Sequence, residues 1–125
     1  MTRIICEEDC GKSPRKLLLK DFNSALARGN EAAVPKRLTN DIVREWVGAA
    51  PVRGREAVAR LLRQMKDEAR QELVIQNIIT HGNAGSVNGT LRLTDGRSYG
   101  FCHVFQLSGA KGARIQRITS YEIRQ

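Results

Sequence analysis

Two residues of this sequence have the chemistry of a general acid/base couple, Glu45 and His103. Each lies in a stretch that alternates apolar and polar residues, and side chains two positions apart share one face of a strand. Glu45 shares its face with Val43 and Val47, and His103 lies in an aromatic row of the same kind. Burial raises the pKa of a carboxyl group and lowers that of an imidazole, whereas their mutual attraction shifts each pKa back. If both rows line one hollow, we expect the couple to transfer protons near neutral pH.

Plainer roles for the same residues stay open. Glu45 could face solvent at a strand end or pair with an arginine, and His103 could be a core histidine with satisfied hydrogen bonds. His81 lies in a turn with Gly82 and is expected to be exposed. Two histidines far apart in the sequence, neither beside an acidic or thiol cluster, predict no metal site. The sequence has no glycine-rich phosphate-binding loop, so we expect no cofactor.

The composition is typical of one globular domain. The chain has 125 residues, of which 41% are apolar and 27% charged, so we expect a single domain over residues 1–125. No apolar stretch is long enough to span a membrane. The N-terminus carries Glu7, Glu8 and Asp9 where a secretory signal would need an apolar core. Three cysteines are too few for a disulfide framework, so we expect reduced thiols and a cytoplasmic protein.

The formal net charge of +8 raises the question of nucleic-acid binding. The basic residues are dispersed along the chain, however, and are not interleaved with the aromatic residues on which bases stack. Solvated helix faces account for such a distribution. Nucleic acid is therefore the least favoured partner.

The order of predicted elements indicates an α+β fold. Ser13 as N-cap and Pro14 in the first turn predict a helix that ends at Gly29. A weak helix is expected over residues 31–38, because Pro35 removes a backbone donor. Asp-Gly between two alternating runs is typical of a hairpin, and short connections between strands predict an antiparallel meander. The remaining elements are a strand, a helix and four strands, over residues 41–47, 55–70, 73–80, 87–93, 98–107 and 113–123.

Four segments resemble the nuclear transport factor two-like superfamily, especially its SnoaL-like polyketide-cyclase and ketosteroid-isomerase branches. They are residues 23–30 (NSALARGN), 39–43 (TNDIV), 51–58 (PVRGREAV) and 114–121 (RIQRITSY). The resemblance runs from Leu19 to Tyr121. It implies a curved antiparallel β-sheet wrapped by N-terminal helices into a cone-shaped pocket fold, and frequent homodimers formed through the sheet. Residues 1–12 precede the resemblance and are expected to form an extended N-terminal arm.

The resemblance carries over to individual residues only in part. Glu45 falls where ketosteroid isomerases place their general-base aspartate. His103 falls where they place a protonated aspartic acid that stabilises the developing enolate. Phe22 stands at the position of their oxyanion-hole tyrosine and cannot donate a hydrogen bond, which argues against steroid isomerisation as such.

Three functional hypotheses follow. The leading one is a homodimeric pocket protein that binds a small, largely apolar molecule and could isomerise, cyclise or hydrate it with Glu45 and His103. The second is a non-enzymatic dimeric module that recognises another protein, and the third is nucleic-acid binding, whose affinity would fall steeply with salt. In the first hypothesis eight side chains would shape the cavity: Phe22, Val43, Trp46, Val58, Leu62, Met65, Phe101 and Phe105.

Overall fold

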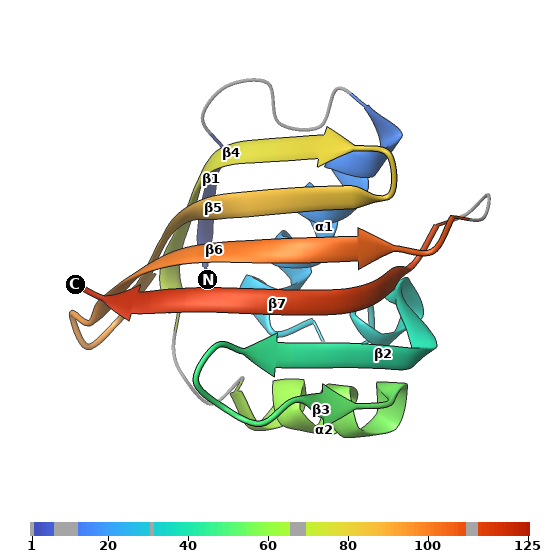
Figure 1. Ribbon diagram of the computed structural model, residues 1–125. Coiled ribbons are helices and arrows are strands. Elements are labelled where there is room, and N and C mark those ends of the chain that lie inside the picture. Colours follow the sequence, from blue (N-terminus) through green and yellow to red (C-terminus); the bar gives the residue numbers. More distant parts are fainter. Residues whose placement is uncertain (1, 7–12, 31, 66–69, 110–112) are drawn as a thin grey trace.

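A computed structural model describes residues 2–6, 13–30, 32–65, 70–109 and 113–125, with the side chains of residues 62–65 left out (Figure 1). The described strands form one seven-stranded sheet in the order β1-β4-β5-β6-β7-β2-β3. Both α-helices lie on the same side of this sheet (Figure 1). This arrangement is the predicted α+β fold. The elements are β1 (Arg3–Cys6), α1 (Pro14–Arg28), the 3-10 turn η1 (Pro35–Arg37), β2 (Leu38–Trp46), β3 (Val52–Arg53), α2 (Arg55–Met65), β4 (Arg70–His81), β5 (Ala84–Leu93), β6 (Ser98–Leu107) and β7 (Ile115–Arg124).

Helix α1 begins and ends where its sequence predicts. The Ser13 hydroxyl accepts a hydrogen bond from the backbone N–H of Lys16 at 3.2 Å, and Pro14 occupies the first turn, where a missing donor costs nothing. Gly29 adopts a left-handed conformation with φ 68° and caps the C-terminus by donating to the carbonyl of Leu26. The helix therefore presents a fixed stripe of side chains to the sheet.

The four long strands form the predicted antiparallel meander, and β4 bends it. The register between β4 and β5 shifts between Ile75 and Asn77, opposite Gly89. A Cβ atom on Gly89 would overlap the carbonyl oxygen of Val74, so the two backbones approach too closely there for any side chain. A bulge of this kind bends a strand and increases its twist. The curvature of the sheet thus depends on a glycine.

Several elements differ from the prediction. Residues 31–38 form no helix beyond the turn η1 among the described residues, because β2 already begins at Leu38. Residues 3–6 of the expected arm form β1, which pairs in parallel with β4, and β2 pairs in parallel with β7. Parallel pairing joins segments far apart in the sequence, so no local pattern indicates it. The end of the helix predicted over residues 55–70 falls outside the described residues after residue 65.

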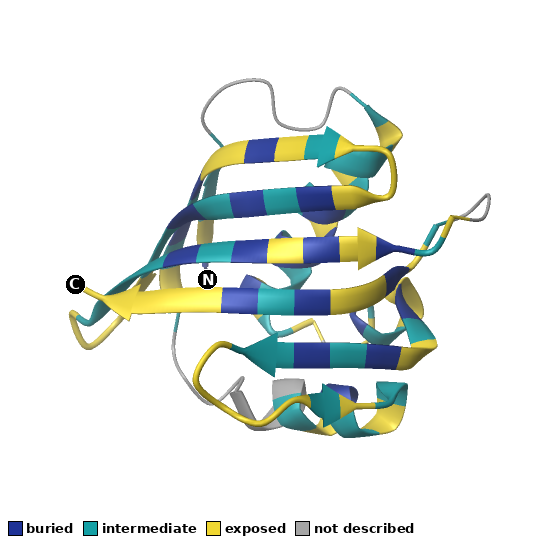
Figure 2. Cartoon of the chain, in the orientation of Figure 1, coloured by how far each residue is buried: buried dark blue, intermediate teal, exposed yellow. Residues whose placement is uncertain are grey.

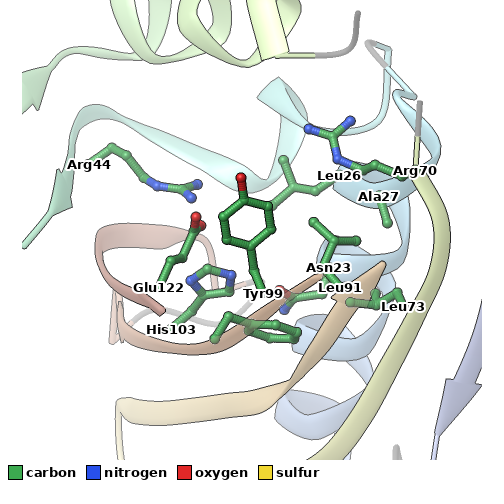
Figure 3. Close-up of a pocket in the computed structure, with 11 residues that line it drawn as sticks. Asn23, Leu26, Ala27, Arg44, Arg70, Leu73, Leu91, Tyr99, His103 and Glu122 are labelled. Carbon is green, nitrogen blue, oxygen red and sulfur yellow. The ribbon is translucent and has the colours of Figure 1, made fainter. Parts of the chain in front are cut away.

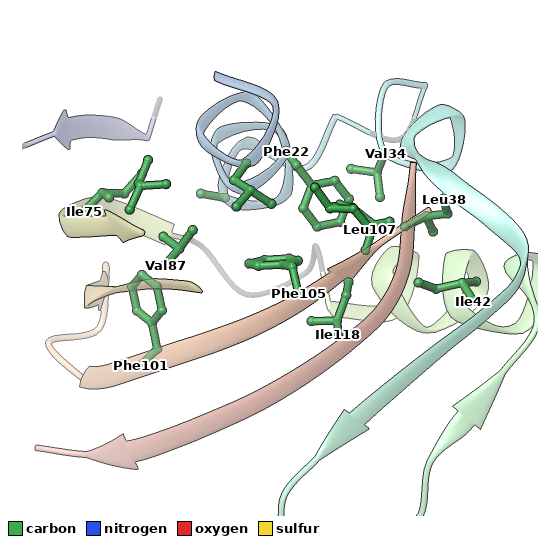
Figure 4. Close-up of a cluster of buried hydrophobic side chains, with 14 of the residues drawn as sticks. Phe22, Val34, Leu38, Ile42, Ile75, Val87, Phe101, Phe105, Leu107 and Ile118 are labelled. Atoms are coloured by element: carbon green, nitrogen blue, oxygen red, sulfur yellow. The ribbon is translucent and has the colours of Figure 1, made fainter. Parts of the chain in front are cut away.

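The hydrophobic core fills one end of the space between α1 and the sheet (Figure 4). The rings of Phe22 and Phe105 meet edge to face with centroids 6.0 Å apart, and both side chains are buried. Along β6 the inward side chains alternate with exposed ones, as Figure 2 shows. Burial of each large apolar side chain contributes about 1.5–3 kcal/mol. Leu107 and Phe105 belong to this core, whereas the other end of β6 leads to a cavity.

The cysteines differ from the expected reduced state. Cys6 is disulfide-bonded, whereas Cys102 is a free thiol. The prediction of three reduced cysteines is therefore wrong for Cys6, and it no longer supports a reducing compartment. No helix in the described ranges combines the length and the apolar character needed to cross a membrane.

Candidate functional site

A cavity of about 70 Å³ lies between α1 and the curved sheet (Figure 3). One water molecule needs roughly 10–15 Å³ of such space, so the cavity has room for several waters or for a compact organic group. Its wall combines apolar side chains with polar and charged ones. The lining residues are Asn23, Leu26 and Ala27 from α1, Arg44 from β2, Arg70 and Leu73 from β4, Leu91 from β5, Tyr99, Phe101 and His103 from β6, and Glu122 from β7.

Arg44 is the most unusual residue of this wall. Its side chain is only 2% exposed, and its guanidinium carbon lies 4.1 Å from the centre of the Trp46 ring. The atoms Nε and Nη1 are buried and have no hydrogen-bond partner among the described residues. Burial lowers the pKa of Arg44 to about 10, against the opposing attraction of Glu122. Arg44 is therefore still a cation at neutral pH, and each unpaired buried donor costs about 1–3 kcal/mol.

His103 lies in the cavity wall, where two neighbours fix the position of its imidazole ring. The ring stacks on Phe101 at 4.8 Å between centroids, and Nδ1 lies 2.8 Å from the hydroxyl oxygen of Ser120. Burial, and to a smaller extent the positive charge of Arg44, together lower the pKa of His103 to about 3. The imidazole is thus neutral at pH 7. A group with so low a pKa forms hydrogen bonds near neutral pH but is a poor general acid or base there.

Glu45 does not face the cavity. Its carboxylate accepts a hydrogen bond from Nη2 of Arg117 at 3.0 Å, and its side chain is 31% exposed. In the register of β2 with β7 it stands opposite Thr119, on the outer face of the sheet. The prediction that Glu45 and His103 look into one hollow is therefore wrong, and the plainer alternative, pairing with an arginine, is what the structure contains. Alternation defined the two faces of β2 correctly, but the inward face carries Arg44.

The carboxylate that lines the cavity is Glu122. It lies on β7 opposite Phe101 and accepts a hydrogen bond from the indole N–H of Trp46 at 3.0 Å. Its side chain is exposed, so it marks the open side of the cavity. The alternation of β7, in which Ile118 and Ser120 are both buried, was the signal that could have placed Glu122 on the inner face.

The other predicted lining residues divide into three groups. Phe101 lines the cavity, and Trp46 packs on Arg44 beside it. The side chains of Leu62 and Met65 lie outside the described residues. The prediction is wrong for the remaining four: Phe22, Val58 and Phe105 are buried in the core, because they point at the filled end of the sheet, and Val43 shares the outer face of β2 with Glu45.

The described residues contain no group of three or more His, Cys, Asp or Glu side chains that could hold a metal ion. The polar groups that line the cavity are instead the guanidinium groups of Arg44 and Arg70, a neutral imidazole, a carboxylate, the amide of Asn23 and the phenol of Tyr99 (Figure 3). The Tyr99 hydroxyl oxygen lies 3.4 Å from Nη1 of Arg97, which donates to it. Such a set can bind a polar oxygen and can accept a proton at the carboxylate.

Solved structures share this fold. An LEH-like epoxide hydrolase from M. tuberculosis is 28% identical, with a TM-score of 0.72 over 86% of this chain and 80% of that one. A putative ketosteroid isomerase from Kribbella flavida is 18% identical, with a TM-score of 0.73 over 86% of this chain and 76% of that one. A nuclear transport factor two-like protein of unknown function from Cytophaga hutchinsonii is 20% identical, with a TM-score of 0.68 over 86% and 97%. The last two likenesses concern the fold alone.

No curated protein matches the chain. The SnoaL-like domain family matches residues 19–118, which include α1 from Leu19 onward, the cavity wall from Asn23 to His103 and the core. The chain therefore belongs to the SnoaL-like domain family, within the nuclear transport factor two-like superfamily.

Proposed function

We propose that this protein binds a compact, largely apolar organic molecule and moves a proton on it in an isomerisation, cyclisation or hydration. The observation that carries the proposal is the composition of the cavity wall. Apolar side chains from α1, β4 and β5 face a buried cation, Arg44, and a carboxylate, Glu122. A largely apolar site with a few convergent polar groups is typical of small-molecule binding.

The two charged groups suit two halves of one reaction. Glu122 would take a proton from a carbon next to a carbonyl group, and the electron pair of the broken C–H bond would move to the carbonyl oxygen. Arg44, fixed on Trp46 and shielded from water, would stabilise the negative charge that develops on this oxygen. If the molecule carries a C=C bond at the β and γ carbons, the electron pair on the oxygen would return through the shifted double bond to the γ-carbon. That carbon would take the proton from Glu122, so that the C=C bond ends next to the carbonyl group. In a hydration, Glu122 would take the proton from the attacking water instead.

The comparisons support this class of reaction without selecting one member. One similar structure is described as an epoxide hydrolase and another as a putative ketosteroid isomerase. This chain departs from the pattern that the ketosteroid-isomerase branch implies, because Glu45 lies outside the cavity and Phe22 is buried in the core. The proposal therefore gives Glu122, not Glu45, the role of base.

A matched pair of carboxylate variants tests the proposal. Deuterium exchange from the α-carbon of small ketones, followed by NMR, reports proton abstraction directly. We expect Glu122→Gln to lower the exchange rate about 100-fold, the usual range for a general base, and Glu45→Gln to leave it unchanged. Equal rates in both variants and the wild type would remove Glu122 from the reaction. Absence of exchange in the wild type with every ketone would leave binding, measured by thermal shift, as the remaining function.

We also propose that the protein forms a homodimer through the outer face of the sheet. Val104, Tyr121 and Ile123 are 41%, 48% and 73% exposed and lie on the neighbouring strands β6 and β7, where Val104 pairs with Thr119 and Tyr121 with Cys102. Such an apolar face is typical of an interface. It would equally serve the alternative function, a dimeric module that recognises another protein.

Nucleic-acid binding and a cytoplasmic location stay predictions. Filter binding at low and high salt tests the first, and cell fractionation tests the second.

A further inference from the structure

No described residue fully compensates the buried charge of Arg44. Two of its three guanidinium nitrogens, Nε and Nη1, are buried without a hydrogen-bond partner among the described residues. Nearly all buried polar groups of native proteins are paired, and a buried charge is rarer still. Because Arg44 also lines the cavity, a ligand bound there can supply the missing hydrogen-bond acceptors.

The neighbours of Arg44 do not supply this partner. Trp46 covers the guanidinium with its ring face, which attracts the cation but accepts no conventional hydrogen bond. His103 is kept neutral by burial and by Arg44 itself. Glu122 is the acidic group that attracts Arg44, but it is exposed and its Oε1 already accepts the indole N–H of Trp46. In Figure 3 the guanidinium and the Glu122 carboxylate lie on the same side of the cavity.

The apolar part of the cavity wall and the cavity volume restrict which anions fit. Leu26, Leu73, Leu91 and Phe101 give the cavity an apolar lining. The volume of about 70 Å³ accommodates only a few non-hydrogen atoms in full burial, and a larger body would extend past Glu122 towards solvent. An inorganic anion such as phosphate would leave the apolar wall unmatched. A compact organic acid matches both parts.

We propose, deepening the function proposed above and resting on it, that the ligand is a small monocarboxylate with a short apolar body, and that the buried guanidinium of Arg44 binds its carboxylate. This carboxylate is then the carbonyl group next to the reacting carbon, so Arg44 both holds it and stabilises the negative charge that develops on its oxygens. Guanidinium groups bind carboxylates, as they bind phosphates, through charge-assisted hydrogen bonds, and the apolar part of the wall favours the organic acid. Arg44 is then the residue that selects an acid over the neutral molecule of the same shape.

Matched acids and amides test this assignment. Isovalerate and benzoate are titrated into the full chain beside isovaleramide and benzamide, with binding followed by protein NMR shifts of the cavity residues. We expect each acid to bind at least about tenfold more tightly than its amide, as loss of one charge-assisted bond implies. Arg44→Met should remove this preference, Arg44→Lys should keep part of it, and Arg117→Met on the outer face should leave it unchanged.

The failures of the two proposals can be told apart. Equal affinity for acid and amide, or an acid preference that survives in Arg44→Met, would overturn the carboxylate assignment while leaving a small-molecule cavity. Absence of acid binding would overturn it too. In that case cyclohexanone serves as a neutral probe, and shifts confined to the cavity residues would keep the proposed function standing. Absence of shifts with every probe would overturn both. Each variant is first compared with the wild type by circular dichroism and by thermal unfolding, so that a change in binding is assigned only to a folded protein.

Discussion

The guanidinium of Arg44 lies over the ring of Trp46, 4.1 Å from its centre. The two residues are two positions apart on β2, so their side chains share one face of the strand. The same indole donates its N–H to Glu122 on β7. One aromatic side chain therefore contacts both Arg44 and Glu122, the cation through its face and the carboxylate through its edge.

Arg44→Met should not destabilise the protein. The change removes a buried charge with two unpaired nitrogens and retains most of the apolar stem that packs against Trp46. Replacing poorly compensated buried charges with apolar groups of similar volume is often neutral, or stabilising by about 1–4 kcal/mol. Urea unfolding at pH 7 measures the difference. A loss of stability comparable to that of a large core truncation would mean that Arg44 is held by its protein contacts rather than kept for a ligand.

Trp46→Leu should destabilise the protein by about 2–3 kcal/mol, because it removes apolar area, the contact with the Arg44 cation and the donor to Glu122. The free energy of unfolding is compared with that of Val47→Ala, an exposed neighbour in the turn that follows β2. We also expect Trp46→Leu to weaken ligand binding more than Val47→Ala does. Equal effects of the two substitutions would contradict a positioning role for the indole.

The stability of the protein should fall as the pH drops below 6.5, partly through His103. The folded state holds this imidazole neutral down to a pKa of about 3, whereas the unfolded chain binds a proton near the ordinary value of 6.5. Protons therefore favour the unfolded chain between these values, and the contribution is fully present only above 6.5. A shift of one pKa unit corresponds to about 1.4 kcal/mol. Protonation of the unfolded chain at this residue therefore lowers the free energy of unfolding by several kcal/mol as the pH approaches 3.

The measurement compares urea unfolding at pH 7, 6, 5 and 4 in the wild type, His103→Gln and His81→Gln. Glutamine does not titrate and can still bond to Ser120, whereas His81 is exposed. We expect His103→Gln to flatten the decline and His81→Gln to follow the wild type. Parallel curves for all three proteins would show that His103 titrates normally and is accessible to water.

Gly89→Ala should cost about 2 kcal/mol or more, because its Cβ would meet the backbone of Val74 and no side chain can move aside. Gly100→Ala is the matched control, since a Cβ there would meet only the flexible end of Gln125 at 3.1 Å. We expect its effect to stay within about 0.5 kcal/mol. Thermal unfolding of both variants decides the point. Equal stabilities would mean that the bend of β4 does not depend on the close approach at Gly89.

The outer face should hold two copies together. Ile123 is 73% exposed on β7, and its burial in a dimer would contribute about 1.5–3 kcal/mol per copy. We expect a dimer in sedimentation equilibrium for the wild type, a monomer for Ile123→Lys, and a dimer for Leu17→Lys, which changes an exposed apolar residue of α1. A wild-type monomer at high micromolar concentration would contradict the proposed homodimer.

Local chemistry determined much of this fold from the sequence alone. Ser13, Pro14 and Gly29 set the ends of α1 because their side chains and dihedral preferences act on neighbouring residues. The hairpin at Asp95-Gly96 follows from the positive φ of 93° that Gly96 adopts without cost. The α+β class followed from the order of such elements, and the family resemblance followed from the four segments at residues 23–30, 39–43, 51–58 and 114–121.

The site depended on relationships that no local pattern contains. Alternation separated Glu45 from Arg44 correctly but could not say which of them faces inward, because both faces of β2 carry apolar residues. The parallel pairing of β2 with β7 decided it, by placing Arg44 beside Ile118 on the inner face and Glu45 beside Thr119 on the outer one. It also brought Glu122 to Trp46 across 76 positions of the chain. Whether a charged side chain meets a cavity or solvent depends on which strands become neighbours, and only the tertiary structure determines that.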